Sequence, residues 1–130
     1  TKIPMGLPGL ETLLPVVYTH GVLAKRITIE QMVEKLCAAP ARLMGLAPRK
    51  GAIQVGADAD IAIIHPKTAH KVDPKKMEGA ADWNPYEGSD LAGFARTTIS
   101  RGDVIVDDYK VVGKEGRGRW LERKSAGPSR

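Results

Sequence analysis

Apolar positions recur at helical spacing between residues 28 and 44. The spacing follows the i, i+3, i+4, i+7 pattern, which predicts an apolar stripe along one helix, made of Ile29, Met32, Val33 and Leu36. Thr28 precedes the stripe and Gln31 stands three residues later. This pairing is typical of a capping box, in which each residue's side chain accepts a hydrogen bond from the other's backbone N–H. The sequence therefore predicts a helix that begins at Thr28.

Prolines and glycines divide the remainder of this N-terminal part. Residues 1–10 contain two of each, which predicts a shaped loop. Residues 11–19 predict a short or kinked helix, because a proline lies within them, and Gly21 is expected to end it. A second short helix is predicted over residues 40–44, since it would begin with a proline and Gly45 would cap its C-terminus.

From residue 51 onward the pattern becomes β-like. Residues 60–65 are apolar and β-branched and end before a proline, which predicts a buried strand. Residues 66–95 are polar and are predicted to be an irregular connection. Three further strands joined by short polar turns predict an antiparallel meander, over residues 97–100, 104–106 and 110–112. Helices followed by strands indicate an α+β fold, whose open sheet edges we expect strands from elsewhere to complete.

The net charge of +5 resides in the C-terminal segment. Residues 110–130 hold seven basic and two acidic side chains, which leaves 13 of each sign in the rest of the chain. A solvated tail is the leading interpretation, followed by docking on an acidic neighbouring subunit. Nucleic acid is disfavoured, because Trp120 is the one stacking residue interleaved in this segment.

Cysteine usage and hydropathy indicate a cytoplasmic protein. Cys37 is the single cysteine, so no internal disulfide can form, as expected in a reducing compartment. Cys37 falls in a helical pattern, and we expect an inert buried thiol. No stretch approaches the roughly 18 apolar residues of a membrane span. The chain opens on Thr1 instead of Met, which suggests a piece of a longer protein.

Residues that could carry hydrolytic chemistry are sparse. The three histidines, His20, His65 and His70, form no His-x-His pair and no helical pair with a carboxylate, as zinc hydrolases require. Asp58 and Asp60 flank a strand start, where turn and capping roles are expected. The sequence therefore predicts no catalytic residue and no metal ligand in this chain.

Several runs nevertheless resemble one family in order and content. They are residues 3–12, with Pro-Gly-Leu-Glu-Thr, residues 40–51, residues 56–61, with Gly-Ala-Asp-Ala-Asp, and residues 84–88, with Asn-Pro-Tyr-Glu-Gly, followed by 98–102. Together they resemble the hydantoinase/dihydropyrimidinase branch of the amidohydrolase superfamily, over nearly the whole chain.

The resemblance implies a C-terminal fragment of a (β/α)8 barrel enzyme with a small β-sandwich. Residues 1–50 would be the end of the barrel, residues 51–112 the sandwich portion and residues 113–130 a basic, Gly-rich tail. The parent would open cyclic amides at a C–N bond with two zinc ions whose ligands lie upstream, so the fragment alone is expected to be inactive. The implied substrate contacts in this chain are Gly6 and the main chain of Met5, which replaces the family's usual Asn. A homotetramer assembled through the sandwich and tail is also implied.

Two other functions remain open at this stage. A non-catalytic, dihydropyrimidinase-related scaffold protein would keep the fold without the metal ligands. An upstream His-x-His motif would indicate the enzyme, and its absence would indicate the scaffold protein. A free-standing basic binding module would melt cooperatively in isolation, whereas an excised piece would associate.

Overall fold

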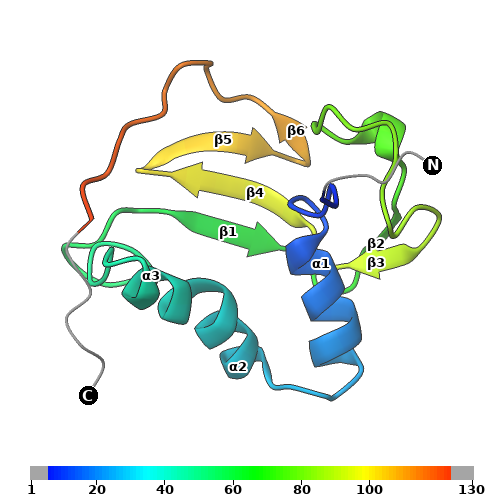
Figure 1. Ribbon diagram of the computed structural model, residues 1–130, viewed down its shortest axis with the longest axis horizontal. Helices are drawn as coiled ribbons and strands as arrows, with labels where there is room; N and C mark the ends of the chain where they lie inside the picture. The colour runs from blue at the N-terminus through cyan, green and yellow to red at the C-terminus, as the bar shows by residue number, and fades with distance from the viewer. Residues whose placement is uncertain (1–5, 124–130) are drawn as a thin grey trace. The chain divides into compact units, whose positions relative to one another are not determined.

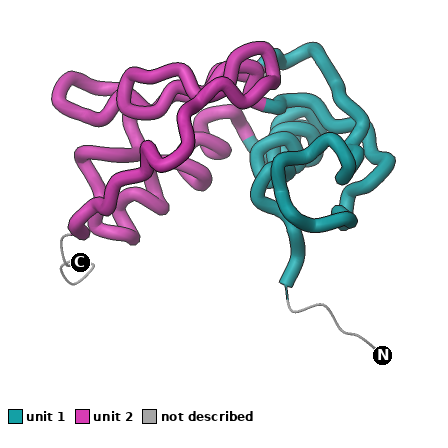
Figure 2. Tube along the Cα trace, turned by 90° about the horizontal axis from the view of Figure 1, so that it is seen from above, with its two compact units in different colours: residues 1–27, 65–94 teal, residues 28–64, 95–130 magenta. Residues whose placement is uncertain are grey.

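The computed structural model describes residues 6–123 of the chain (Figure 1). Two compact units divide these residues (Figure 2). Unit 1 comprises residues 6–27 and 65–94, and unit 2 comprises residues 28–64 and 95–123. Each unit thus joins two segments that are distant in the sequence.

One helical run opens unit 1. The α-helix α1, Leu13–Val17, continues directly into the π-helix η1, Tyr18–Leu23. Pro15 lies in the first turn, where its missing N–H leaves no intrahelical bond unmade. The proline therefore does not break the run, and a helix forms where the sequence predicts one.

The end of this run differs from the prediction. The helix passes through Gly21 and ends at Leu23, and Lys25 beyond it adopts a left-handed φ of 57°. Gly21 has a different role, because an added Cβ would lie 3.0 Å from the Cδ1 atom of Ile27. The missing side chain makes room for the returning chain, so the prediction that Gly21 ends the helix is wrong.

Two short strands complete unit 1 where the sequence predicts an irregular connection. Strand β2, Ala69–Lys71, pairs antiparallel with β3, Asp90–Ala92, and a 3-10 helix, η3, Pro74–Lys76, lies between them in the sequence. The prediction for residues 66–95 is therefore wrong in part. A three-residue strand is too short to show an alternation of apolar and polar residues. The pairing of such strands depends on contacts between residues that are distant in the sequence.

The core of unit 1 joins its helical run to β3. The Thr19 hydroxyl accepts a hydrogen bond from the Ala92 N–H at 2.9 Å and donates one to the Ala92 carbonyl at 3.1 Å. The buried side chains of this unit are Thr12, Pro15, Tyr18, Val72, Pro74, Asn84, Leu91 and Ala92. Two of these, Thr12 and Asn84, are polar and belong to the site described below.

Unit 2 begins with a second continuous helical run. It consists of α2, Ile29–Val33, the π-helix η2, Glu34–Ala38, and α3, Ala39–Leu43. The prediction of two separate helices is wrong, because Pro40 lies within the run. Proline lacks the N–H for a regular helical bond and its ring crowds the carbonyl four residues earlier. The π-helical turn before Pro40 is where the run departs from regular α-helical bonding.

Both predicted caps of this run are confirmed. The Gln31 N–H donates to Thr28 Oγ1 at 3.2 Å, and the Thr28 N–H donates to Gln31 Oε1 at 2.9 Å. At the other end Gly45 has φ 66° and its N–H donates to the Arg42 carbonyl. Local chemistry therefore fixes where this run begins and ends.

Burial along the run departs from a simple stripe. Of the four predicted stripe residues Met32 alone is buried, while Ile29 and Val33 are exposed by 41% and 46%. Cys37 is exposed, so the expectation of a buried thiol is wrong. Cys37 lies in the π-helical turn, which changes the phase on which the helical pattern depends.

The four-stranded antiparallel sheet of unit 2 has the order β1-β4-β5-β6. Its strands are β1, Ile61–Ile64, β4, Ala95–Ser100, β5, Asp103–Asp107, and β6, Lys110–Val111. The last three follow one another as the predicted meander, which is confirmed. Strand β1 joins beside β4, with Ile61 opposite Ile99.

Both hairpin turns of the meander use left-handed residues. Arg101 and Gly102 have φ values of 51° and 85°, and Asp108 and Tyr109 have values of 45° and 65°. Two consecutive positive φ values are typical of type I′ turns, whose twist matches the strands. Arg96 supports the second turn, because its carbonyl accepts from the Tyr109 N–H and its Nε lies 3.2 Å from Asp108 Oδ1.

The α+β prediction is confirmed by these elements. Helices come first and antiparallel strands follow, apart from the 3-10 helix η3 between β2 and β3. The assignment of the helices to a barrel and of the strands to a sandwich stays a prediction.

Candidate functional site

The loop before α1 carries the residues that the resemblance assigns to substrate binding. Gly6 has φ 112° with no atom within 4 Å of a would-be Cβ, so the backbone conformation, not crowding, requires glycine there. Further along, the Gly9 N–H donates to the Leu7 carbonyl at 2.9 Å, and the fully buried Thr12 donates its hydroxyl to the Gly9 carbonyl. Residues 6–12, the N-terminal loop below, are therefore folded back on themselves.

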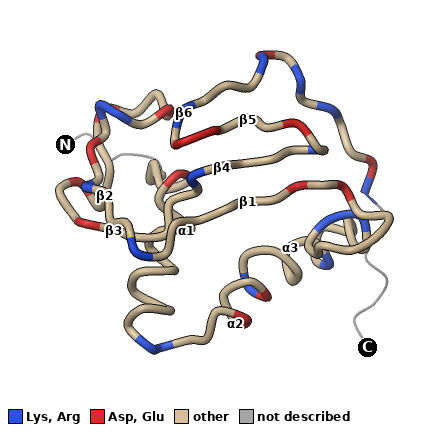
Figure 3. Tube along the Cα trace, turned by 180° about the vertical axis from the view of Figure 1, so that it is seen from behind, with Lys and Arg blue, Asp and Glu red and all other residues tan. Residues whose placement is uncertain are grey.

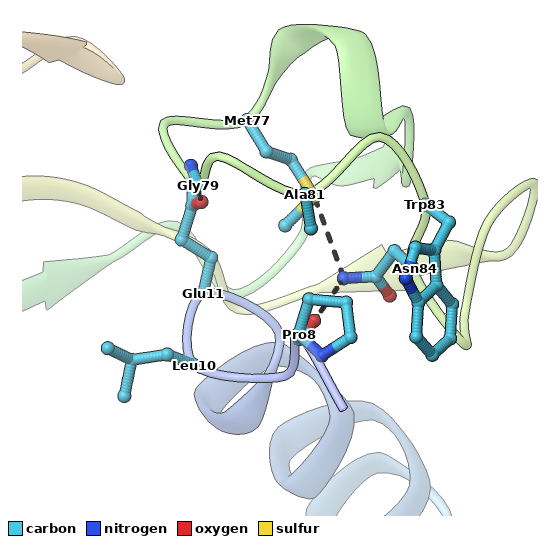
Figure 4. A pocket seen from close by; sticks show the side chains of 8 residues that line it. All are labelled: Pro8, Leu10, Glu11, Met77, Gly79, Ala81, Trp83 and Asn84. Carbon is cyan, nitrogen blue, oxygen red and sulfur yellow. Dashed lines mark hydrogen bonds between the residues drawn. The ribbon is translucent and has the colours of Figure 1, made fainter. Parts of the chain in front are cut away.

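Asn84 binds this loop from a segment far along the chain (Figure 4). Its Nδ2 donates to the Pro8 carbonyl at 2.7 Å, and its Oδ1 accepts from the Tyr86 N–H at 3.0 Å. The residue is only 6% exposed, so water cannot easily replace either bond. The Asn-Pro-Tyr-Glu-Gly run thus forms a side-chain-closed turn whose amide points at the N-terminal loop.

Glu11 makes the second connection between the same two segments. Its two carboxylate oxygens accept from the backbone N–H groups of Glu78 and Gly79, at 3.3 and 3.0 Å. Hydrogen bonds from backbone N–H groups to a carboxylate are stronger than those between neutral groups. The Pro-Gly-Leu-Glu-Thr run and the segment 77–88 therefore interlock at two points.

A small open cavity of about 90 Å³ lies between these contacts (Figure 4). It is lined by Pro8, Leu10, Glu11, Met77, Gly79, Ala81, Trp83 and Asn84. Small-molecule sites commonly measure roughly 300–1,000 Å³. The cavity is therefore too small to enclose a ring substrate by itself.

A metal site would need several ligating side chains close together. No group of three His, Cys, Asp or Glu side chains within residues 6–123 could hold a metal ion. His65 Nδ1 lies 2.7 Å from the Thr68 hydroxyl, and the His70 ring meets Phe94 edge-on at 5.7 Å. The described residues thus do not fit the zinc site that the resemblance implies for the parent.

The Gly-Ala-Asp-Ala-Asp run forms an ion-pair network in unit 2. Lys50 Nζ lies 2.8 Å from Asp58 Oδ2 and also contacts Asp60, while Arg49 Nε lies 3.0 Å from Asp58. Asp60 Oδ1 accepts from the Arg101 N–H at 2.8 Å. The two carboxylates join the residues before β1 to the β4–β5 turn, which is a structural role.

The charges of this network support one another. Burial is the largest single influence on Lys50 and opposes its charge, but Asp58 and Asp60 together outweigh it and raise the pKa of Lys50. The hydrogen bond from Lys50 is the main cause that lowers the pKa of Asp58. Burial opposes ionisation of Asp60, yet Lys50 and the Arg101 N–H lower its pKa below the ordinary value. All three groups are therefore held in their charged forms.

Comparison with known proteins places these features in a family. Residues 11–106 match the model of the amidohydrolase family. D-phenylhydantoinase of Escherichia coli O1:K1 / APEC is 40% identical over 124 residues, covering 95% of this chain and 27% of that protein. The same enzyme of Escherichia coli K12 / DH10B is 41% identical over the same length.

The chain belongs to the amidohydrolase family.

Solved structures agree with this assignment. A D-hydantoinase structure superposes with a TM-score of 0.91 at 40% identity, covering 95% of this amidohydrolase chain and 27% of that chain. The L-hydantoinase (dihydropyrimidinase) from Arthrobacter aurescens gives 0.87 at 36% identity, covering 91% and 26%. The resemblance to the hydantoinase/dihydropyrimidinase branch is therefore confirmed, and the chain spans about a quarter of the length of these relatives.

The predicted substrate contacts fall at the edge of what the structure describes. Met5 lies outside the described residues, and Gly6 is the first residue within them. Sequence reasoning did not foresee the roles of Asn84 and Glu11. The signal was present, because both belong to the runs that carry the resemblance to amidohydrolases, but nothing in the sequence placed those runs side by side.

Proposed function

We propose that this chain is the C-terminal part of a metal-dependent hydrolase that opens cyclic amides, hydantoins or dihydropyrimidines, at a ring C–N bond. The observation that carries the proposal is the 40% identity to a D-phenylhydantoinase across 95% of the chain. The N-terminal loop and the Asn-Pro-Tyr-Glu-Gly run interlock through Asn84, which gives the loop a defined shape.

The proposal divides the chain as the resemblance does. Residues 1–50 would close the barrel, residues 51–112 would belong to the sandwich and residues 113–130 would form the tail. Two zinc ions would be held by residues upstream of this chain. When bound, zinc polarises a carbonyl and makes a water nucleophilic at neutral pH.

Substrate binding would be the contribution of this chain. A cyclic amide presents an N–H donor beside a C=O acceptor, and a main chain in a fixed conformation offers the complementary acceptor and donor. We assign this contact to Gly6 and the main chain of Met5. The left-handed conformation of Gly6 supports a main-chain contact, because the backbone there carries no side chain to obstruct a ring.

The test compares the 130-residue chain with the full-length protein that contains it. We expect the full-length protein to open phenylhydantoin or dihydrouracil, to lose this activity on chelation and to regain it with zinc. The chain alone should show no turnover at any zinc concentration. Metal-dependent turnover by the chain alone would overturn this division of roles. A folded full-length protein that binds no zinc and opens no ring would identify a non-catalytic scaffold.

We also propose a cytoplasmic homo-oligomer, a tetramer, assembled through the sandwich and the tail. No helix within the described part of the chain is long and apolar enough to span a membrane. Basic residues line the segment that follows β6 (Figure 3). Arg117 binds the Ser100 carbonyl and Asp103, whereas Trp120 is 87% exposed. An exposed tryptophan among arginines suits an interface anchor with a polar rim.

Removal of residues 114–130 from the full-length protein tests the role of the tail. We expect smaller species in sedimentation after the deletion, and partial dissociation of the intact protein as salt screens the charges of its tail. If the truncated protein keeps the oligomer mass and the stability of the intact protein, the interface role of the tail is contradicted.

A further inference from the structure

The contact between Asn84 and Pro8 fixes the chain two residues from Gly6. We infer that Asn84 is a positioning residue for ring binding, because its side-chain amide holds the Pro8 carbonyl and thereby the main chain that meets the substrate. The inference rests on the proposed function, since it assigns a role at the same site. Asn84 does not itself contact the substrate.

The chemistry of the asparagine amide suits this role. Its Oδ1 is already engaged by the Tyr86 N–H at 3.0 Å, which fixes the plane of the amide and aims Nδ2 at the Pro8 carbonyl, 2.7 Å away. Proline has no N–H, so its carbonyl is the only backbone hydrogen-bonding group at that position. An aspartate of the same shape would keep the bond to Tyr86 but would place a carboxylate oxygen against the Pro8 carbonyl.

Glu11 holds the opposite side of the same loop. Its carboxylate binds the N–H groups of Glu78 and Gly79, so the N-terminal loop is held at residues 8 and 11 by one distant segment. Two attachments flank the exposed Leu10 and restrict the conformations of the loop before substrate arrives. A preorganised loop binds more tightly because less conformational entropy is lost on binding.

The test is steady-state kinetics of the full-length protein carrying Asn84→Asp. We expect the KM for the ring substrate to rise about tenfold, because a loop that is no longer held at Pro8 must lose more conformational entropy when the ring binds. The kcat should change by less than about twofold, because the loss falls on binding of ground state and transition state alike. Zinc content should equal that of the wild type.

A purely structural role would give a different result. Loss of folded protein would lower the apparent kcat in step with the folded fraction and leave KM unchanged. Glu87→Gln is the matched control, because Glu87 is exposed and belongs to the same run, and its kinetics should be those of the wild type.

Glu11→Gln keeps the test decisive if Asn84→Asp does not fold. Its amide keeps one oxygen acceptor, but the NH2 group that replaces the other oxygen cannot accept from a backbone N–H. The site is solvent-exposed, so we expect a folded protein with a smaller rise in KM, about twofold to threefold, because one of the two hydrogen bonds is lost. Wild-type KM in the folded variants overturns the inference while leaving the proposed function intact. A wild-type protein that opens no ring overturns both.

Discussion

Replacing Gly93 with alanine tests how closely β3 approaches the helical run of unit 1. A Cβ at position 93 would lie 2.5 Å from Tyr18 Cδ1, 2.7 Å from its Cγ and 2.8 Å from its Cβ. Carbon atoms in contact normally lie about 3.5–4.0 Å apart. Tyr18 is only 6% exposed, so its ring cannot move away without disturbing its neighbours.

Two effects add in the Gly93→Ala variant. Gly93 has φ 87°, and an L-residue in the left-handed region costs about 1–2 kcal/mol. Overpacking a filled core typically costs a further 1–3 kcal/mol or so. We therefore expect the free energy of unfolding to fall by roughly 2–5 kcal/mol.

Gly88→Ala separates the two effects within the same unit. Gly88 also has a positive φ, 79°, but nothing lies within 4 Å of its would-be Cβ, so only the backbone cost of about 1–2 kcal/mol applies. The assay is urea denaturation followed by tryptophan fluorescence. Trp83 is partly buried and belongs to unit 1, whereas Trp120 is largely exposed and should respond less. Equal destabilisation by the two variants would refute the close approach of Gly93 to Tyr18.

Two further predictions concern unit 2. Thr28→Ala removes the hydroxyl acceptor of the capping box and should lower the free energy of unfolding by about 1 kcal/mol. Reversible thermal melting measures this effect, and an unchanged melting temperature would count against the cap. Lys50→Met should destabilise the chain most between about pH 4 and 10, the interval bounded by the ordinary pKa values of Asp and Lys. The raised pKa of Lys50 gives stability that is present below the ordinary lysine value and lost as pH rises through the raised one. The lowered pKa values of Asp58 and Asp60 give stability that is present above the ordinary aspartate value and lost as pH falls through the lowered ones. Denaturant titrations of both proteins across pH should therefore converge at the two extremes, and a pH-independent difference would contradict the network.

Features set by neighbouring residues could be predicted from the sequence. The capping box at Thr28 and the cap at Gly45 each depend on residues three or four apart, and both form as predicted. The β4–β6 meander follows the same logic, because its turns join consecutive strands. The family could also be recognised, since short runs of specific residues preserve their order along the chain.

Features that depend on distant contacts were decided by the tertiary structure alone. Pairing of β2 with β3 needs residues about 20 positions apart to meet, and its short strands carry no alternating pattern of their own. Asn84 and Pro8 are 76 positions apart, and Glu11 and Gly79 are 68 apart. No local propensity encodes such pairs, because they form only when the packing of the helical run against β3 brings the two segments together. The sequence therefore indicated the runs that contain the contacting residues, and the tertiary structure determined which of those residues hold one another.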